Sequence, residues 1–306
     1  MKNWEYIALI IVIILFILVP FFIGPYLLHV ATTILAFLSL ALSWDMMLRT
    51  GQLSFGTAGF FGIGGYAAVL TYLGLDINPL LSIVLGGVLA AVIAFVLGFA
   101  ILRLRGIYFA ITTLALAGVF MVIIKNLSNL TGGAEGTILP SAIFKGDPIK
   151  IYWLTLAIAI ITIIISELFQ KTKIHFAITS IRNDEIVAKS SGIDIFKYLI
   201  FVFVITSAIQ GIIGGAYAQQ YGFVSPESTF SAHFLLLPIA MCLAGGLYTT
   251  IGSVIGAVIL GIIAEYLKMQ FPYGHLIIYG VIIVLVVLLM PRGIAGTIKD
   301  LLKRRE

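Results

Sequence analysis

The chain has 306 residues, of which 61% are hydrophobic and only 10% are charged, with a formal net charge of +5. A soluble domain carries about 25% charged residues, and a mean hydropathy of +1.17 leaves too little polar surface to cover a chain of this length. The composition excludes a soluble globular protein and predicts an all-α polytopic membrane protein. The single cysteine, Cys242, excludes a disulfide within the chain.

Charged residues, and in one place the turn from Gly245 to Thr250, divide the sequence into apolar runs. Their lengths approach the roughly 20 residues that a helix needs to cross a hydrocarbon core of about 30 Å. The uncharged run from Tyr6 to Trp44 is long enough for two helices, with the turn expected at His29. We expect the first of them to be retained, because no small-residue cleavage site of a signal peptide follows it. The ten predicted spans lie near residues 6–28, 30–48, 52–74, 77–102, 106–124, 151–167, 198–220, 232–248, 251–267 and 275–290.

Basic residues orient these spans, because Lys and Arg favour the cytoplasmic side of a membrane. Ten crossings place both termini on one side, and 14 of the 18 Lys and Arg residues then share that side. We therefore predict one transmembrane domain over residues 1–306 with both termini cytoplasmic. It has a cytoplasmic loop at about 168–197, an external loop at about 125–150 and a cytoplasmic basic tail at 291–306. The net positive charge is assigned to this asymmetry and not to a nucleic-acid partner.

Several kinds of catalytic and ion-binding motif are missing from the sequence. It contains no Gly-x-x-x-x-Gly-Lys-Ser/Thr loop, so any ATP must be hydrolysed by another chain. No Gly-x-Ser-x-Gly elbow is present, and the four histidines lack the i+3 or i+4 partners of a helical metal site. We therefore expect no catalytic residue, no metal and no cofactor. Five acidic residues are expected to reach water at helix ends or in connections, which argues against a coupling ion at mid-membrane: Asp45, Asp76, Glu167, Glu227 and Glu265.

The segment GQLSFGTAGFFGIGGY at residues 51–66 gives the third predicted helix one face of almost bare backbone. Two interpretations stay open. In lipid, helices with small residues pack closely, so the face can be a tight helix crossing. Glycines with a few hydroxyls can also leave room for a solute, which favours a pore. The candidate residues for pore lining or close helix packing are Ser54, Gly56, Thr57, Gly59, Gly62 and Gly65, together with Thr112 and Thr113 from a later segment.

The cytoplasmic loop contains the sequence AITSIRNDEIVAKSSGIDIFKY at residues 177–198, which predicts a short helix. Asn183 is the expected N-cap, and Gly192 suits the position after the helix end. A helix of about two turns is marginal alone in water, so it needs a surface to dock against. The alternative is a solvated connector. On the docking interpretation, the residues that contact a cytosolic partner are Asp184, Glu185, Ile186, Ala188, Lys189 and Gly192.

These segments resemble the LivM-type permease subunits of branched-chain amino-acid ABC importers. The matching stretches run in order and span most of the chain after its first 45 residues. They are residues 51–66, LRLRGIYFAITTLALAGVF at 102–120, LTGGAEGT at 130–137, IRNDEIVAKSSGI at 181–193, GFVSPES at 222–228, and the glycines from Gly245 to Gly261. The loop at 181–193 is similar to the family's coupling loop, with Glu185, Ala188 and Gly192 on the matching positions.

The resemblance implies an ABC importer permease fold and a non-catalytic half of a translocation pore in a prokaryotic plasma membrane. Its implied partners are a homologous second permease, two cytosolic ATPase subunits that bind the ATP, and an external substrate-binding protein. The expected substrates are leucine, isoleucine and valine. The alternatives are a permease of a related urea or short-amide ABC importer, and an ion-coupled secondary transporter that works as one chain.

Overall fold

The computed structural model describes residues 11, 14–271, 280, 281, 284, 293, 294, 296 and 297, and the chain divides into two compact units. Unit 1 comprises residues 1–45, 148–163 and 237–306, and unit 2 comprises residues 46–147 and 164–236. The chain passes between the units four times. Three of these passages lie within helices, in α2 (Pro25–Leu48), α7 (Pro148–Lys171) and α12 (His233–Gly245), and the fourth lies directly before α7. Unit 1 also contains η1 (Val19–Phe21) and α13 (Thr250–Gln270).

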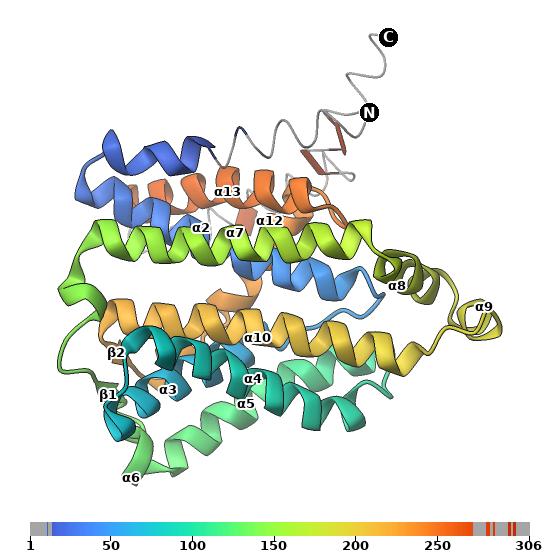
Figure 1. Cartoon of the computed structure of the whole chain (residues 1–306), viewed down its shortest axis with the longest axis horizontal. Helices are drawn as coiled ribbons and strands as arrows, with labels where there is room; N and C mark the ends of the chain where they lie inside the picture. The colour runs from blue at the N-terminus through green and yellow to red at the C-terminus, as the bar shows by residue number, and fades with distance from the viewer. Residues whose placement is uncertain are drawn as a thin grey trace. The chain divides into compact units, whose positions relative to one another are not determined.

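Unit 2 holds most of the remaining elements, which Figure 1 labels. Its long helices are α3 (Thr57–Leu75), α4 (Pro79–Ile101), α5 (Ile107–Asn126) and α10 (Ile195–Tyr221). The shorter elements are α6 (Ser128–Thr131), β1 (Thr137–Ile138), η2 (Ile143–Gly146), α8 (Lys173–Asn183), α9 (Glu185–Ser190), β2 (Phe223–Val224) and α11 (Pro226–Thr229). The strands β1 and β2 pair antiparallel over two residues each, so the fold is all-α apart from this short ribbon.

Eight helical segments of the described residues are long and apolar enough to cross a membrane, with α11 and α12 taken together as one. They coincide with eight of the ten predicted spans. The other two predicted spans, near 6–28 and 275–290, lie partly outside the described residues. The chain is therefore a polytopic helical membrane protein, while ten crossings and cytoplasmic termini stay predictions.

Two predicted helix boundaries are wrong. His29 lies inside α2, because that helix begins at Pro25, whose fixed φ suits the first turn of a helix. The third span begins at Thr57 and not near residue 52. Side chains hold the backbone just before it, since the Phe55 N–H donates to Thr113 Oγ1 at 2.9 Å and the Gly56 N–H donates to Ser54 Oγ at 3.3 Å.

Glycines bring three helices of unit 2 into close contact. Figure 1 shows α3, α4 and α10 side by side, and small residues meet at their crossings. A Cβ on Gly64 of α3 would overlap the backbone of Gly211 in α10, and a Cβ on Gly211 would lie 2.6 Å from the Cβ of Ala90 in α4. Such close approach replaces the hydrophobic effect as the source of helix association in lipid. The close packing of α3 against its neighbours explains why residues 57–69 of α3 are all buried.

Candidate functional site

The first half of the glycine face of α3 packs against α5 within unit 2. A Cβ added to Gly56 would lie 3.4 Å from the carbonyl oxygen of Thr113, and one added to Gly59 would lie 3.2 Å from the Cα of Ala117. Thr113 itself is fully buried and accepts the Phe55 N–H. The structure therefore places this half of the face in a close helix contact.

The second half of the face is covered by α11 and the residue after it. A Cβ on Gly62 would overlap the ring of Phe230, and a Cβ on Gly65 would lie 3.3 Å from Cγ2 of Thr229. The Phe230 ring stacks on Tyr66, with centroids 6.1 Å apart and an interplanar angle of 19°. Sequence patterns do not predict Phe230 at this place, because it lies 168 positions after Gly62 in the chain.

An ion pair fixes α11 to the end of α5. Lys125 Nζ lies 2.5 Å from Glu227 Oε1. Lys125 is in the last turn of α5, and Glu227 is in the first turn of α11. The segment that covers Gly62 and Gly65 is thus held by a charge contact as well as by packing.

The hydroxyl residues predicted beside the glycines lie in different environments. Ser54 and Thr57 are buried, with Thr57 fully so, and Thr113 faces α3, whereas Thr112 is only half-buried on α5. Within the described part of the chain, the buried oxygens Thr57 Oγ1 and Tyr66 Oη have no hydrogen-bond partner. Unpaired buried hydroxyls are uncommon and call for an explanation. A role of these residues in lining a pore stays a prediction.

The predicted short helix of the loop at 168–197 is α9, and it follows a second helix, α8. The N-cap is Asp184 and not Asn183, because Asn183 is the last residue of α8. One carboxylate oxygen of Asp184 accepts the backbone N–H groups of Ile186 and Val187 at 2.8 and 3.1 Å. A carboxylate at this position also interacts favourably with the positive end of the helix dipole, which an asparagine cannot do.

The end of α9 is closed by a glycine in the left-handed region. Gly192 has φ +78°, its N–H donates to the Lys189 carbonyl at 3.0 Å, and the next N–H, of Ile193, donates to Ala188 at 3.1 Å. This pair of bonds is the Schellman arrangement, in which the positive φ strongly favours glycine.

The surface of α9 divides into a buried and an exposed side. Ala188 is 1% exposed, whereas Ile186 and Val187 are 79% and 60% exposed. Figure 1 shows α9 beyond the N-terminal end of α10, joined to it by a short connection. Two adjacent aliphatic side chains on a short, well-capped helix form an apolar contact surface, which we call the α9 tip.

The α8–α9 segment rests on two connections between the helices of unit 2. A Cβ on Gly51, which precedes α3, would lie 3.2 Å from the Cα of Arg182 in α8. Arg105, which precedes α5, forms an ion pair with Glu185 of α9, with Nε and Oε1 2.5 Å apart. Gly51 and Arg105 were not among the predicted site residues, although they lie within the motifs at residues 51–66 and 102–120.

In unit 1, the expectation that Asp45 reaches water is wrong. Asp45 is fully buried, and its Oδ1 accepts the Tyr248 N–H at 2.7 Å. The connection between α12 and α13 covers this carboxylate. The position of Asp45 near the end of a predicted span does not reveal this burial. Asp76 and Glu227 are exposed, as predicted. Among the described residues, no three His, Cys, Asp or Glu side chains gather in a group that could hold a metal ion.

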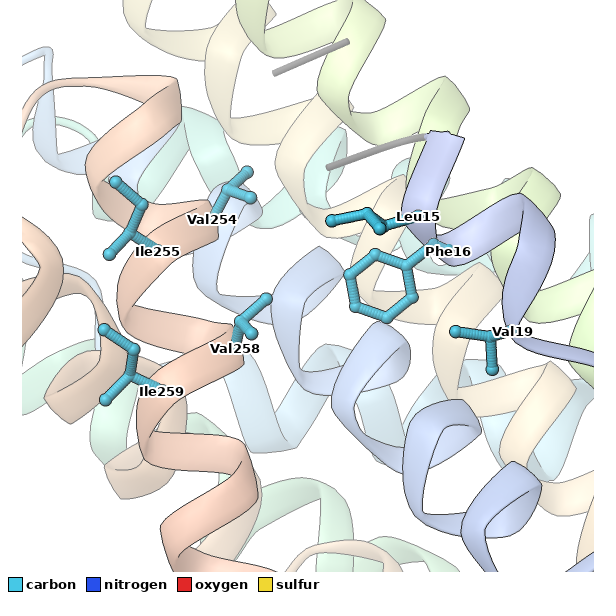
Figure 2. Close-up of a pocket in the computed structure, with 7 residues that line it drawn as sticks. All are labelled: Leu15, Phe16, Val19, Val254, Ile255, Val258 and Ile259. Carbon is cyan, nitrogen blue, oxygen red and sulfur yellow. The ribbon is translucent and has the colours of Figure 1, made fainter. Parts of the chain in front are cut away.

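A groove in unit 1 offers no polar group to a solute. Figure 2 shows its lining, which comes from the segment before α2 and from α13, and its volume is about 360 Å³. The lining residues are Leu15, Phe16, Val19, Val254, Ile255, Val258 and Ile259. A zwitterionic amino acid needs hydrogen-bond partners when it leaves water, so this groove is not its binding site.

A bundle of apolar helices long enough to cross a membrane defines a polytopic helical membrane protein. A family model described as branched-chain amino acid transport system, permease component, matches residues 26–287. The chain belongs to this family.

Relatives in bacteria and archaea support the assignment. The chain is 27% identical to the high-affinity branched-chain amino acid transport system permease protein LivM of Escherichia coli, over 94% of this chain and 74% of that protein. It is 26% identical to the probable branched-chain amino acid transport permease protein LivH of Methanocaldococcus jannaschii, over 80% and 85% of the two chains. Among solved structures, a chain of PsaBC from Streptococcus pneumoniae in complex with Fab has the same fold, with a TM-score of 0.50, 15% identity and coverage of 94% and 98%.

Proposed function

We propose that this chain forms half of the translocation pore of an ATP-driven importer that takes up leucine, isoleucine and valine. Its ten helices have both termini in the cytoplasm of a prokaryotic cell. The chain performs no chemistry itself. The α9 tip receives the movement of an ATPase subunit, and the helices of the membrane domain convert it into opening and closing of the pore.

The observation that carries the proposal is the α9 tip. Ile186 and Val187 are 79% and 60% exposed on a helix that is capped at both ends, and adjacent exposed aliphatic side chains form an apolar patch of the kind that binds a partner. The apolar α9 tip is flanked by the charged residues Asp184 and Lys189, and such a surface suits an apolar groove with a polar rim on a partner. The basic residues of the loop at 168–197 support its cytoplasmic side, where ATP is available.

The partners follow from the relatives and from the sequence. Relatives with the LivM and LivH names both match this chain, which supports pairing with a homologous second permease. The missing phosphate-binding loop supports separate subunits that bind and hydrolyse ATP. An external substrate-binding protein completes the importer and supplies most of the selectivity.

Two alternative functions use the same membrane domain. A permease for urea or short amides would share the fold and the α9 tip and differ in its substrate. An ion-coupled carrier would need a titratable group inside the membrane domain. Asp45 was predicted to reach water, and its burial in the structure makes it a candidate for such a group. Its hydrogen bond to Tyr248 gives Asp45 a structural role that needs no coupling ion.

Co-purification followed by reconstitution tests the proposal. We expect the chain to be isolated with a second permease and ATPase subunits, and the complex to hydrolyse ATP faster with the binding protein and leucine. Uptake of labelled leucine into proteoliposomes should require ATP and persist when ionophores abolish ion gradients. Uptake that follows an ion gradient without ATP would refute the proposal, and stimulation by urea in place of leucine would select the first alternative.

A matched pair of surface variants tests the α9 tip. Ile186→Ser should strongly reduce co-purification of the ATPase subunits, because burial of one isoleucine is worth roughly 1.5–3 kcal/mol. Ile138→Ser removes an isoleucine of similar exposure, 74% against 79%, from β1 in the predicted external loop. It should leave co-purification unchanged. Equal retention of the ATPase in both variants would show that the α9 tip is not the docking element.

A further inference from the structure

An ion pair joins α9 to the connection that leads into α5. Nε of Arg105 and Oε1 of Glu185 are 2.5 Å apart, and the two side chains are 39% and 36% exposed. Glu185 is the first residue of α9, directly after its N-cap. The carboxylate that the sequence assigned to contact with an ATPase therefore has a partner within its own chain.

The guanidinium of Arg105 is also held by its own backbone. Nη1 donates to the carbonyls of Leu102 and Leu104, the second at 3.2 Å. Both carbonyls belong to the turn between α4 and α5, so the cation is hydrogen-bonded to that turn. Its contact with Glu185 is a charge contact, because the buried Nε makes no hydrogen bond among the described residues although Oε1 lies 2.5 Å away. The planar guanidinium holds both contacts at once, whereas a lysine ammonium is a single point charge.

The residue after Arg105 turns this connection directly into α5. Gly106 has φ +57° and ψ −127°, a combination that glycine adopts readily and other residues avoid. It is the N-cap of α5, and no heavy atom lies within 4 Å of the place where a Cβ would stand. Only one residue, Gly106, separates Arg105 from the first turn of α5, so a displacement of Arg105 acts on that turn.

The first turns of α5 are in turn the contact surface for the glycine face of α3. The Thr113 hydroxyl accepts the Phe55 N–H at 2.9 Å, and Ala117 lies against Gly59. A shift of α5 thus changes its contact with Gly56 and Gly59, two of the candidate pore residues. The path from α9 to this contact runs through one ion pair and one helix.

We propose that Arg105 is a positioning residue that joins α9 to α5, so that movement of α9 displaces α5 against the glycine face of α3. The inference rests on the proposed function, in which an ATPase moves α9. It assigns Glu185 to transmission within the permease, while Ile186 and Val187 make the contact with the partner.

A distance measurement tests the positioning without any partner subunit. Ile186 and Tyr108 are 79% and 71% exposed, and Cys242 is fully buried, so cysteines at the first two positions accept spin labels selectively. In the full chain purified from membranes, we expect one narrow distance distribution that broadens in Arg105→Gln. The control is Lys125→Gln, which removes the ion pair at the opposite end of α5. An unchanged distribution in Arg105→Gln would overturn the proposal.

A coupling ratio tests the transmission in the reconstituted importer. The measured quantity is leucine taken up per ATP hydrolysed. Because the pair is partly exposed, we expect Arg105→Gln and Glu185→Gln each to lower the ratio roughly two- to five-fold. The double charge exchange Arg105→Glu with Glu185→Arg should restore most of it, and Arg105→Lys should restore part.

The outcomes separate this inference from the proposed function. If the unmodified chain co-purifies with no ATPase, the proposed function fails, while the spin-label distances still decide whether Arg105 positions α9. If the unmodified importer couples uptake to ATP and Arg105→Gln does so equally well, Arg105 has no part in transmission. Loss of coupling that the charge exchange does not restore would also refute a role for the ion pair.

Discussion

The crossing of α10 with α4 is sensitive to a single methyl group at Gly211. A Cβ there would lie 2.6 Å from the Cβ of Ala90, 3.0 Å from the carbonyl oxygen of Gly86 and 3.1 Å from the Cα of Gly87. Ordinary contact begins at 3.4 Å. All three neighbours are backbone atoms or a Cβ, which no rotamer change can move, so Gly211→Ala must displace one helix from the other.

The expected cost follows from these overlaps. Adding a methyl group to a well-packed core costs about 1–3 kcal/mol of stability. Part of this cost arises because a gap of about 0.5–1 Å along the displaced helix removes about a quarter to a half of the van der Waals attraction of each contact. The higher helix propensity of alanine returns up to about 1 kcal/mol. Gly118→Ala in α5 receives that gain without an overlap, because no heavy atom lies within 4 Å of its added Cβ. The two variants should therefore differ by roughly 1–3 kcal/mol.

Thermal unfolding of the purified chain in detergent measures this difference. We expect Gly211→Ala to unfold several degrees below the unmodified chain and Gly118→Ala to unfold at or above its temperature. The double variant Gly211→Ala with Ala90→Gly removes the largest overlap and should recover most of the loss. If Gly211→Ala unfolds at the same temperature as Gly118→Ala, the close packing of α10 on α4 is not what holds these helices together.

Three further predictions concern topology, the glycine face and the α9 helix. Reporter fusions after Lys145 and after Arg305 should report opposite sides of the membrane, and the same side for both would refute the ten-span topology. Gly62→Leu should abolish leucine uptake because the leucine side chain displaces the Phe230 ring. The control Gly118→Leu should keep full uptake. Full uptake in Gly62→Leu as well would show that α11 and Phe230 can move away from α3 without loss of transport. Gly192→Leu should reduce ATPase stimulation but not membrane insertion, since its φ of +78° costs a leucine about 1–2 kcal/mol while nothing lies within 4 Å of the added Cβ; stimulation equal to the unmodified chain would leave the end of α9 without a role in docking.

The apolar runs predicted the helices well and their boundaries less well. All eight membrane-length helices of the described residues coincide with predicted spans, because the free energy of burying a segment in lipid depends on its composition and length. The predicted start of α3 is five residues too early, because the absence of charge after Arg49 does not reveal that the backbone before Thr57 is held by the Thr113 and Ser54 side chains. The predicted N-cap of α9 is one residue too early, because α8 continues through Asn183.

The sequence by itself determined that this protein is a helical membrane permease and where its longest polar loop, at residues 168–197, forms a short helix. Hydropathy, glycine spacing and capping residues act within a few turns of a helix, and all of them can be counted along the chain. Only the tertiary structure decided what each glycine faces, that Phe230 covers Gly62, that Asp45 is buried beneath Tyr248, and that Arg105 holds Glu185. The last three of these contacts join residues about 80 to 200 positions apart. Their partners are set by how helices cross, which no local pattern encodes.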